Sequence, residues 1–417
     1  MPKYAYLGTI ITMENEPYAQ GVITENGKIK AVGTKEEISN LMDDDTIKID
    51  LGDKILMPAF IDGHSHITAL ASTLDLINLS SAENIDDIIN SVKKYISINN
   101  PKPEEWIMGF GYDNNKMPNL LHPTKYDLDL IDCPNPILIT HASGHMGVLN
   151  TNAIKCLGIT KNTPVPEGGV MGKTETGEPN GYFEETAFSA ITSKVPPQSI
   201  EHYCQLIEKA QEIYLKNGVA TIQDGLTKQK EFDALKKLSS ENRLKADILC
   251  CVDINFDKIL DDNKDLVKQY KNNLKIAGYK IFLDGSPQGR TAWLSKPYLN
   301  NKENPDYCGY PVHKDNDVVE FCKKSIKYNV QIFAHCNGDK ACHQFVESYC
   351  KANQNSNLRP VMIHAQLLSS DDMPKMASLN MIASFFVTHT YYWGDVHISN
   401  LGIERASKIS PVKSAIN

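Results

Sequence analysis

Apolar residues in this chain are gathered into short runs of β type, and stretches with a helical pattern separate these runs. From residue 55 onward the pattern predicts seven strands. They cover residues 55–61, 219–222, 246–252, 276–283, 330–334, 360–363 and 381–387. Repeated strand–helix units predict a parallel sheet, and this many favour a (β/α)8 barrel of the TIM type, with the eighth unit missing, over an open doubly wound sheet. No Gly-x-Gly-x-x-Gly or Walker-type loop follows any strand, which argues against a nucleotide-binding fold.

The first part of the chain, residues 1–57, has the pattern of a small β unit. Residues 21–33 indicate a hairpin, because Asn26-Gly27 is the strongest short signal for a hairpin turn. A unit of this size is too small to bury a core of its own, so we expect it to pack on a barrel formed by residues 58–417.

A long interval at residues 67–217 interrupts the barrel pattern. It holds an expected helix at 85–98, an expected strand at 137–141 and a Gly/Pro-rich stretch at 164–181. An interval of this length exceeds an ordinary strand-to-helix connection, so we interpret it as an insertion that carries substrate specificity.

The composition is that of an ordinary globular protein: of the 417 residues, 41% are hydrophobic and 23% are charged. The formal net charge of -8 disfavours nucleic acid and anionic membranes as partners, so a small-molecule substrate is expected. The N-terminus lacks the features of a signal peptide and no apolar run approaches a spanning helix in length, which predicts a cytoplasmic protein. The ten cysteines include no Cys-x-x-Cys pair and are expected to be free thiols.

Two histidines one residue apart, His64 and His66, follow the first apolar run directly. Residues two apart on an extended chain project from the same face, so both imidazoles can reach one ion. Imidazole is a favoured ligand of zinc and similar divalent metals, and the pair therefore indicates a catalytic metal site. The alternative is a pair that only makes local hydrogen bonds near a turn.

Three further histidines come at the ends of later strands: His335, His364 and His389. Because the chemistry of such barrels lies at the carboxyl ends of the strands, we expect His335 and His364 to be metal ligands as well. His389 is predicted to contact the substrate, although it could equally cap a strand.

A lysine, Lys280, stands inside the apolar run 276–283, and Asp284 follows that run. A charged lysine buried without a partner is costly, which leaves two interpretations. Lys280 either pairs with Asp284 or another carboxylate of the barrel, or it is carboxylated by CO2 and becomes an oxygen ligand that bridges two metal ions.

These residues carry a resemblance to a known family. The stretch 58–66, the Lys280 strand with Asp284-Gly285-Ser286, the strand ends at His335 and His364, and the stretch 391–395 together resemble the amidohydrolase superfamily. The similarity is to its amidohydrolase-3 branch, the YtcJ-like and N-substituted formamide deformylase-like metal-dependent hydrolases. It implies a barrel flanked by a β-sandwich built from both ends of the chain.

The resemblance also implies a centre of one or two divalent ions, zinc being the first choice. His64 and His66 would hold the more buried ion, His335 and His364 the second, and carboxylated Lys280 would bridge them. The implied reaction is hydrolysis of carbon–nitrogen bonds other than peptide bonds, such as amides or formamides, by metal-activated hydroxide. His364 and Lys280 are the expected catalytic residues.

On the substrate side, the resemblance adds a motif at residues 141–150 that contains His145. His145, His389 and Asp284 are therefore the expected substrate-binding residues, with packing in the core an equally good interpretation of His145.

Members of the family place a further aspartate after an eighth strand, where it binds metal and shuttles a proton. No eighth apolar run follows residue 387, so we expect these residues to be the front portion of a longer enzyme. The open sheet edges that result favour association, and a homo-oligomer is compatible with them. Two alternatives stay open: an impaired barrel kept as a binding or assembly subunit, and a mononuclear deaminase-like hydrolase in which Lys280 is only structural.

Overall fold

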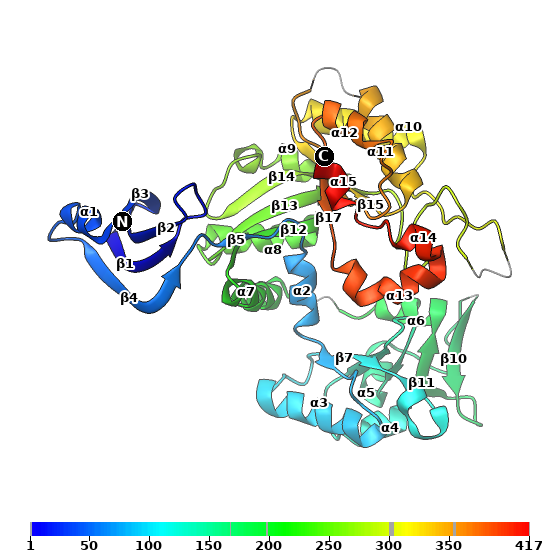
Figure 1. Ribbon diagram of the computed structural model, residues 1–417. Helices are drawn as coiled ribbons and strands as arrows, with labels where there is room; N and C mark the ends of the chain where they lie inside the picture. The colour runs from blue at the N-terminus through cyan, green and yellow to red at the C-terminus, as the bar shows by residue number, and fades with distance from the viewer. Residues whose placement is uncertain (1, 167, 197–198, 300–303, 353–355, 417) are drawn as a thin grey trace.

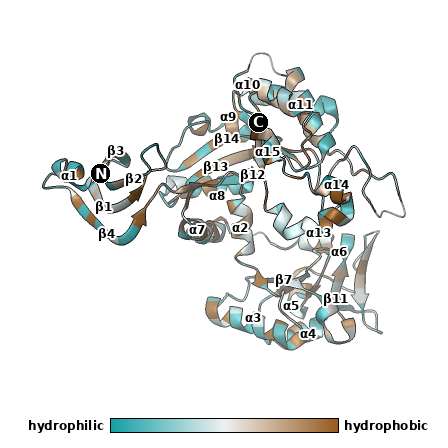
Figure 2. Ribbon diagram, viewed as in Figure 1, coloured by the Kyte–Doolittle hydropathy of each residue, from teal (hydrophilic) through white to brown (hydrophobic). Residues whose placement is uncertain are grey.

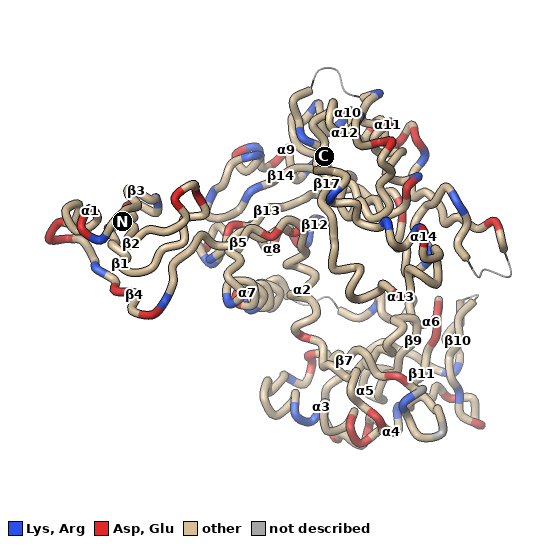
Figure 3. Tube along the Cα trace, in the orientation of Figure 1, with Lys and Arg blue, Asp and Glu red and all other residues tan. Residues whose placement is uncertain are grey.

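The computed structural model describes residues 2–166, 168–196, 199–299, 304–352 and 356–416. Its strands form three sheets, one in each of three parts of the molecule (Figure 1). Charged residues of both signs are spread over all three parts (Figure 3). No helix in the described ranges is both long enough and apolar enough to cross a membrane.

The N-terminal part is one mixed sheet with the strand order β3-β2-β1-β4. Its elements are β1 (Lys3–Ile11), β2 (Tyr18–Glu25), β3 (Lys28–Gly33), α1 (Lys35–Asn40) and β4 (Ile47–Leu56). The predicted hairpin is confirmed: Asn26 and Gly27 both have positive φ, of 53° and 72°, which a tight turn between β2 and β3 requires. The structure describes one sheet here, so the second layer of the expected sandwich stays a prediction.

The central part is a curled sheet of seven parallel strands in the order β17-β16-β15-β14-β13-β12-β5. The strands are β5 (Phe60–Ile61), β12 (Val219–Thr227), β13 (Asp247–Asp253), β14 (Leu274–Phe282), β15 (Gln331–Cys336), β16 (Val361–His364) and β17 (Ile382–Phe385). Six of the seven predicted strands are confirmed, and each lies beside its neighbour in chain order. Of the predicted run 55–61 only Phe60–Ile61 belongs to this sheet, because residues 55 and 56 end β4 of the N-terminal sheet. This parallel α/β sheet is consistent with a barrel-type fold; the missing eighth unit is not tested by it.

Helices cover one face of this sheet. They are α2 (Ile67–Thr73), α7 (Ile200–Lys216), α8 (Gln229–Ser240), α9 (Asp257–Asp261), α10 (Asp315–Lys327), α11 (Asp339–Ala352) and α12 (Met373–Ser378), with a 3-10 turn η3 (Lys264–Leu266). Their apolar stripes and the outward side chains of the strands form the main core. Helices such as α11 alternate teal and brown along their length, as amphipathic helices do (Figure 2).

The opposite face of the sheet carries a smaller core made by strand residues alone: Cys251, Ala277, Phe333, Val361 and Ile363. Because side chains alternate along a strand, and register partners on neighbouring strands point to the same face, this face also receives His335, two residues after Phe333, and Lys280, the register partner of Phe333. The candidate site therefore sits above a packed apolar floor, toward the carboxyl ends of the strands.

The first strand differs from its prediction as a buried strand. Phe60 and Ile61 in β5 are 55% and 75% exposed. The physical reason is that β5 is an edge strand, which in the described part of the chain pairs only with β12. Apolar runs at an edge stay open to solvent unless another element covers them.

The insertion forms a sheet of its own, in the order β10-β11-β9-β8-β7-β6. Its strands are β6 (Ile77–Asn78), β7 (Ile107–Tyr112), β8 (Ile137–His141), β9 (Met146–Leu149), β10 (Gly169–Lys173) and β11 (Pro179–Glu184). Its helices are α3 (Ile85–Asn99), α4 (Lys125–Asp129), α5 (Thr151–Cys156) and α6 (Glu185–Thr192), with 3-10 turns η1 (Asn114–Lys116) and η2 (Pro118–Leu120). The predicted helix at 85–98 and strand at 137–141 are confirmed.

Three helices follow the last strand: α13 (His389–Leu401), α14 (Ile403–Ala406) and α15 (Val412–Ile416). Helix α13 is kinked at Trp393, where φ is -133° and ψ is 17°.

Candidate metal centre

The four histidines predicted as metal ligands come together at the carboxyl ends of the parallel strands. The ring centroids of His64 and His66 are 5.0 Å apart, those of His64 and His364 are 5.3 Å apart, and those of His335 and His364 are 4.6 Å apart. Residues separated by 300 positions in the chain thus form one continuous cluster, as the parallel topology requires.

The His64–His66 segment is held by strand β12. The backbone N–H of Gly225 donates to the carbonyl of Ser65 at 2.8 Å, and the hydroxyls of Ser65 and Tyr214 are in contact. Asp224 accepts hydrogen bonds from the Thr68 hydroxyl at 2.6 Å and the Thr68 N–H at 3.2 Å. The start of α2 is therefore fastened to β12 on both sides of His66.

Gly225 supplies a first test of this cluster. A Cβ added there would lie 2.8 Å from Cε1 of His66 and 2.7 Å from the Ser65 carbonyl, so Gly225→Ala must displace the imidazole or its backbone. We expect affinity for a divalent ion to fall about tenfold or more, the usual cost of disturbing the support of a ligand. Titration calorimetry with zinc measures this.

The matched control is Gly63→Ala, because a Cβ on Gly63 meets nothing within 4 Å. Equal zinc affinity for Gly225→Ala and Gly63→Ala would show that the His66 ring is not part of the metal centre.

Lys280 is buried among these histidines, at 2% exposure, and its Nζ has no hydrogen-bond partner. It lies 5.0 Å from the ring centroid of Phe282. Its charge helps to lower the pKa of four imidazoles, those of His64, His66, His335 and His364. Burial in turn lowers the pKa of Lys280 itself to about 8.

The first interpretation of Lys280, a pair with Asp284, is not found, because Nζ of Lys280 has no hydrogen-bond partner. The carboxylate of Asp284 instead accepts three backbone N–H groups, those of Trp293 at 3.0 Å, Asn337 at 2.9 Å and Gly338 at 2.7 Å. Asp284 therefore ties the loop after β14 to the loop after β15, and burial raises its pKa to about 7. Its role in substrate binding stays a prediction.

All four histidines are neutral in this environment. Burial is the largest cause, and it lowers the pKa of His64 to about 3, of His66 and His335 to about 4, and of His364 to about 2. Neutral imidazole is the form that binds a metal ion, so the cluster needs no proton release before binding.

His335 and His364 are each oriented by their surroundings. Nε2 of His335 lies 3.1 Å from the carbonyl of Gly285 and 3.0 Å from Nδ2 of Asn337, which leaves Nδ1 for another partner. His364 has a φ of 72°, a left-handed conformation that is uncommon for residues other than glycine. Backbone held in such a conformation is concentrated at functional sites.

The donor atoms of the cluster fit a divalent ion. Nδ1 of His64, Nδ1 of His364 and Nζ of Lys280 are buried and unpaired, and imidazole nitrogen is a preferred ligand of zinc. Within the described residues, no three His, Cys, Asp or Glu side chains already stand in the arrangement that holds an ion. Ligand chemistry and burial thus fit a metal, while the final coordination geometry is not preformed.

Of the two other histidines predicted to bind substrate, one lies at the histidine cluster and the other lies in the insertion. His389 begins α13, is 4% exposed and has its ring 6.0 Å from that of His364, so it joins the cluster. It follows β17 by four residues rather than capping it. His145 lies in the insertion, is exposed, and places Nδ1 3.1 Å from Oε2 of Glu185.

Sequence reasoning missed Asp224, Asn337 and His397. Asp224 stands in the apolar run after Val219, and Asn337 comes two residues after His335, so both could have been noticed as polar residues at strand ends. His397 lies eight residues after His389 on α13, and only the packing of that helix shows that the two rings stack.

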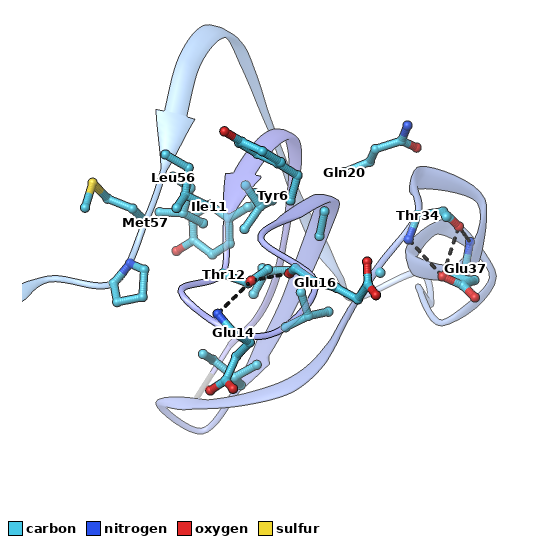
Figure 4. Close-up of a pocket in the computed structure, with 18 of the residues that line it drawn as sticks. Tyr6, Ile11, Thr12, Glu14, Glu16, Gln20, Thr34, Glu37, Leu56 and Met57 are labelled. Atoms are coloured by element: carbon cyan, nitrogen blue, oxygen red, sulfur yellow. Dashed lines mark hydrogen bonds between the residues drawn. The ribbon is translucent and has the colours of Figure 1, made fainter.

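A cavity of about 1000 Å³ lies elsewhere, on the N-terminal sheet (Figure 4). Tyr6, Ile11, Leu56 and Met57 give it apolar walls, and Glu14 is at its rim. It contains none of the predicted site residues and no imidazole, so the chemistry is better assigned to the histidine cluster.

A parallel α/β sheet with imidazoles and a buried lysine at its carboxyl edge is the arrangement of a metal-dependent hydrolase of the barrel class. An uncharacterized metal-dependent hydrolase from Pyrococcus furiosus has a similar structure, with a TM-score of 0.82, 25% sequence identity, and coverage of 99% of this chain and 82% of that one. The sequence profile of the Amidohydrolase family matches residues 48–417, and the chain belongs to this family.

Two curated proteins agree with this membership. The chain is 26% identical to the putative amidohydrolase YtcJ of Bacillus subtilis, over 98% of this chain and 77% of that protein. It is 23% identical to the N-substituted formamide deformylase of Arthrobacter pascens, over 96% of this chain and 75% of that protein. The family resemblance seen in the motifs is thus confirmed, and the membership supports a hydrolase function.

Proposed function

We propose that this protein is a metal-dependent hydrolase of carbon–nitrogen bonds other than peptide bonds, acting on amides or formamides. The observation that carries the proposal is the cluster of four neutral, buried imidazoles around the unpaired amine of Lys280. The name of the deformylase relative supports the bond type.

In this proposal His64 and His66 hold one divalent ion, and His335 and His364 hold a second. Zinc is the first choice because imidazole suits it. The neutral amine of Lys280 adds to CO2, a nitrogen–carbon bond forms, and one proton leaves to water. One C=O π bond of CO2 breaks and its electron pair goes to oxygen, so the product is an anionic carbamate whose oxygens would serve as ligands for the ions that the four histidines would hold.

When bound, a divalent ion supplies Lewis acidity and lowers the pKa of a water molecule to about 7. The protein's own residues supply the remaining functions. The apolar floor of the sheet, which includes Phe333, would keep bulk water away from the reacting bond. His364, whose Nδ1 is unpaired, would act in catalysis through the ion that it holds, and His389 beside it would face the substrate.

On the substrate side, His145 and Glu185 form a polar pair on the insertion. We propose that this pair contacts the part of the substrate far from the reacting bond, and that Asp284 acts mainly by fixing the loops that border it.

The test is a hydrolysis screen over formamides and N-acyl compounds, with the protein loaded with zinc, manganese or cobalt. Release of formate or of the free amine is the measurement, and metal-dependent turnover of at least one compound class is expected. No turnover with any of the three metals would favour the alternative of a binding or assembly subunit.

A further inference from the structure

The turn between β8 and β9 brings together a serine, a histidine and an aspartate that have no part in the proposed metal centre. Oγ of Ser143 lies 2.9 Å from Nδ1 of His141, and Nε2 of the same ring lies 3.6 Å from Oδ1 of Asp113. A hydroxyl, an imidazole and a carboxylate in this order are the nucleophile, the base and the orienting group of serine-based acyl transfer.

The hydrogen bonds around His141 decide which ring nitrogen is the base. The backbone N–H of Ser143 donates to Nδ1 at 3.0 Å, so Nδ1 presents a lone pair and the proton of the neutral ring is on Nε2. The hydroxyl of Ser143 therefore donates to Nδ1 as well. Within the described residues Nε2 has no hydrogen-bond partner, and the carboxylate of Asp113 is the acceptor that a small shortening of the 3.6 Å contact would supply.

The strands that carry these groups hold them in place. Asp113 directly follows β7, and His141 is the last residue of β8, which pairs with β7 in parallel. The N–H of Ala142 donates to the carbonyl of Tyr112 at 2.8 Å, and the rings of Tyr112 and His141 pack edge to face with their centroids 5.2 Å apart. The imidazole is thus fixed between the serine and the carboxylate before any reagent arrives.

The nucleophile is open to solvent although its base is buried. His141 is 8% exposed, whereas Ser143 and its neighbours Ala142 and Gly144 are exposed. Gly144 has a φ of 77°, and its N–H donates to the carbonyl of His141 at 2.9 Å, so the chain reverses tightly at this point. A small reagent can therefore reach Oγ of Ser143 directly from solvent and needs no cavity.

The backbone of this turn limits the reagents that can react. The N–H groups of Ala142, Ser143, Gly144 and His145 all donate within the described structure, that of His145 to Oγ of Ser143 at 3.2 Å. None of these four is left to stabilise an oxyanion, and the loss of even one such donor costs about a hundredfold or more in rate. Only esters with a good leaving group, such as aryl esters, are therefore expected to react.

We propose that Ser143 is an acyl-acceptor site that takes small acyl groups from activated esters without a metal ion, with His141 as its base and Asp113 as the orienting group. Oγ of Ser143 forms a bond to the carbonyl carbon, the bond from that carbon to the aryl oxygen breaks, and its electron pair leaves with the phenolate. The hydroxyl proton passes to Nδ1 of His141 and from there to the phenolate or to water. This reaction goes beyond the proposed function and does not depend on it.

The experiment incubates the full chain with para-nitrophenyl acetate and measures, by mass spectrometry of the digested protein, how fast each serine gains an acetyl group. The internal reference is Ser193, an exposed serine whose Oγ donates to the carbonyl of Ala190 at 2.9 Å. We expect Ser143 to be acetylated about a hundredfold faster than Ser193, the usual contribution of a positioned base. The rate at Ser143 should be the same in zinc-loaded and in chelator-treated protein.

Two variants test the roles of the neighbouring groups. His141→Phe keeps a ring against Tyr112 but removes the base, and should slow acetylation of Ser143 about a hundredfold without changing that of Ser193. Asp113→Asn should slow it by about tenfold, because the N–H of Ser143 already fixes the tautomer of His141 and only the charge of the carboxylate is lost. Ser193→Ala is the matched control for Ser143→Ala: only the second should remove the rapid release of phenolate.

Equal acetylation of Ser143 and Ser193 in the wild-type protein would overturn the proposal, and so would a His141→Phe protein that acetylates Ser143 as fast as the wild type. The comparison of the two serines needs no variant, so it decides the matter even if a variant fails to fold. An acetyl group on Ser143 is not a product of the metal centre, so rapid acetylation without turnover of any formamide would support this site and reject the proposed hydrolase.

Discussion

Lys280→Met is expected to reduce hydrolysis by about a thousandfold or more while making the metal-free protein more stable. The loss of activity follows from removal of the proposed bridging ligand, and a thousandfold corresponds to about 4 kcal/mol of barrier. The gain in stability follows from the burial of Lys280, whose Nζ has no partner. Replacing a buried, unbalanced charge by an apolar side chain of similar length stabilises by about 1 to 3 kcal/mol.

Formamide turnover and thermal unfolding of the same preparation measure the two effects. Lys275→Met is the matched control, because Lys275 lies on the same strand with its Nζ 4.3 Å from the Tyr270 ring and away from the imidazoles. A Lys280→Met protein that keeps its activity would exclude a bridging role and would favour the mononuclear alternative.

The parallel sheet could be predicted because its signals are local. Each strand is a short apolar run such as 276–283 or 360–363, and topology then requires the strand ends to meet. The clustering of His335 with His364 follows from that rule without any knowledge of contacts. The same holds for the β2–β3 turn at Asn26, which a dipeptide encodes.

Features that depend on what packs against an element could not be predicted in this way. The run 55–61 has the composition of a buried strand, yet β5 is at a sheet edge and Ile61 is exposed. Charge alone allows a pair between Lys280 and Asp284, which is one of the two interpretations that the sequence leaves open. It is wrong because three backbone N–H groups occupy the Asp284 carboxylate, and a one-dimensional pattern does not show backbone donors.

His397 shows the same limit at the candidate site. Its spacing from His389 indicates neither burial nor stacking, because α13 is kinked at Trp393 and its orientation is set by Asn400 and Arg290. The burial of a polar residue on a helix becomes evident only once the inward face of that helix is known. The positions of functional side chains at strand ends can thus be predicted from the sequence, whereas those on a helix that packs over the strand ends cannot.

Removal of metal is the second change with a large expected effect. Dialysis against a chelator should abolish hydrolysis, and zinc should restore it. The reason is that neutral imidazoles cannot activate water as a Lewis acid, so the proposed reaction depends on the ion that the histidine cluster holds. Zinc at a hundred times its Kd should also stabilise the folded protein by about 3 kcal/mol, since the unfolded chain does not assemble the site. Activity assays and thermal unfolding measure both.

The number of ions bound distinguishes the mechanisms that share this metal dependence. If Lys280 is carboxylated, metal analysis after reconstitution with bicarbonate should find two ions per chain, and reconstitution in buffer freed of CO2 should find fewer, with activity falling in parallel. Lys280→Met should bind fewer ions in both buffers and lose the response to bicarbonate. One ion per chain in every condition would contradict the bridge, because the unpaired Nζ of Lys280 would then be a cost of the fold without a part in metal binding.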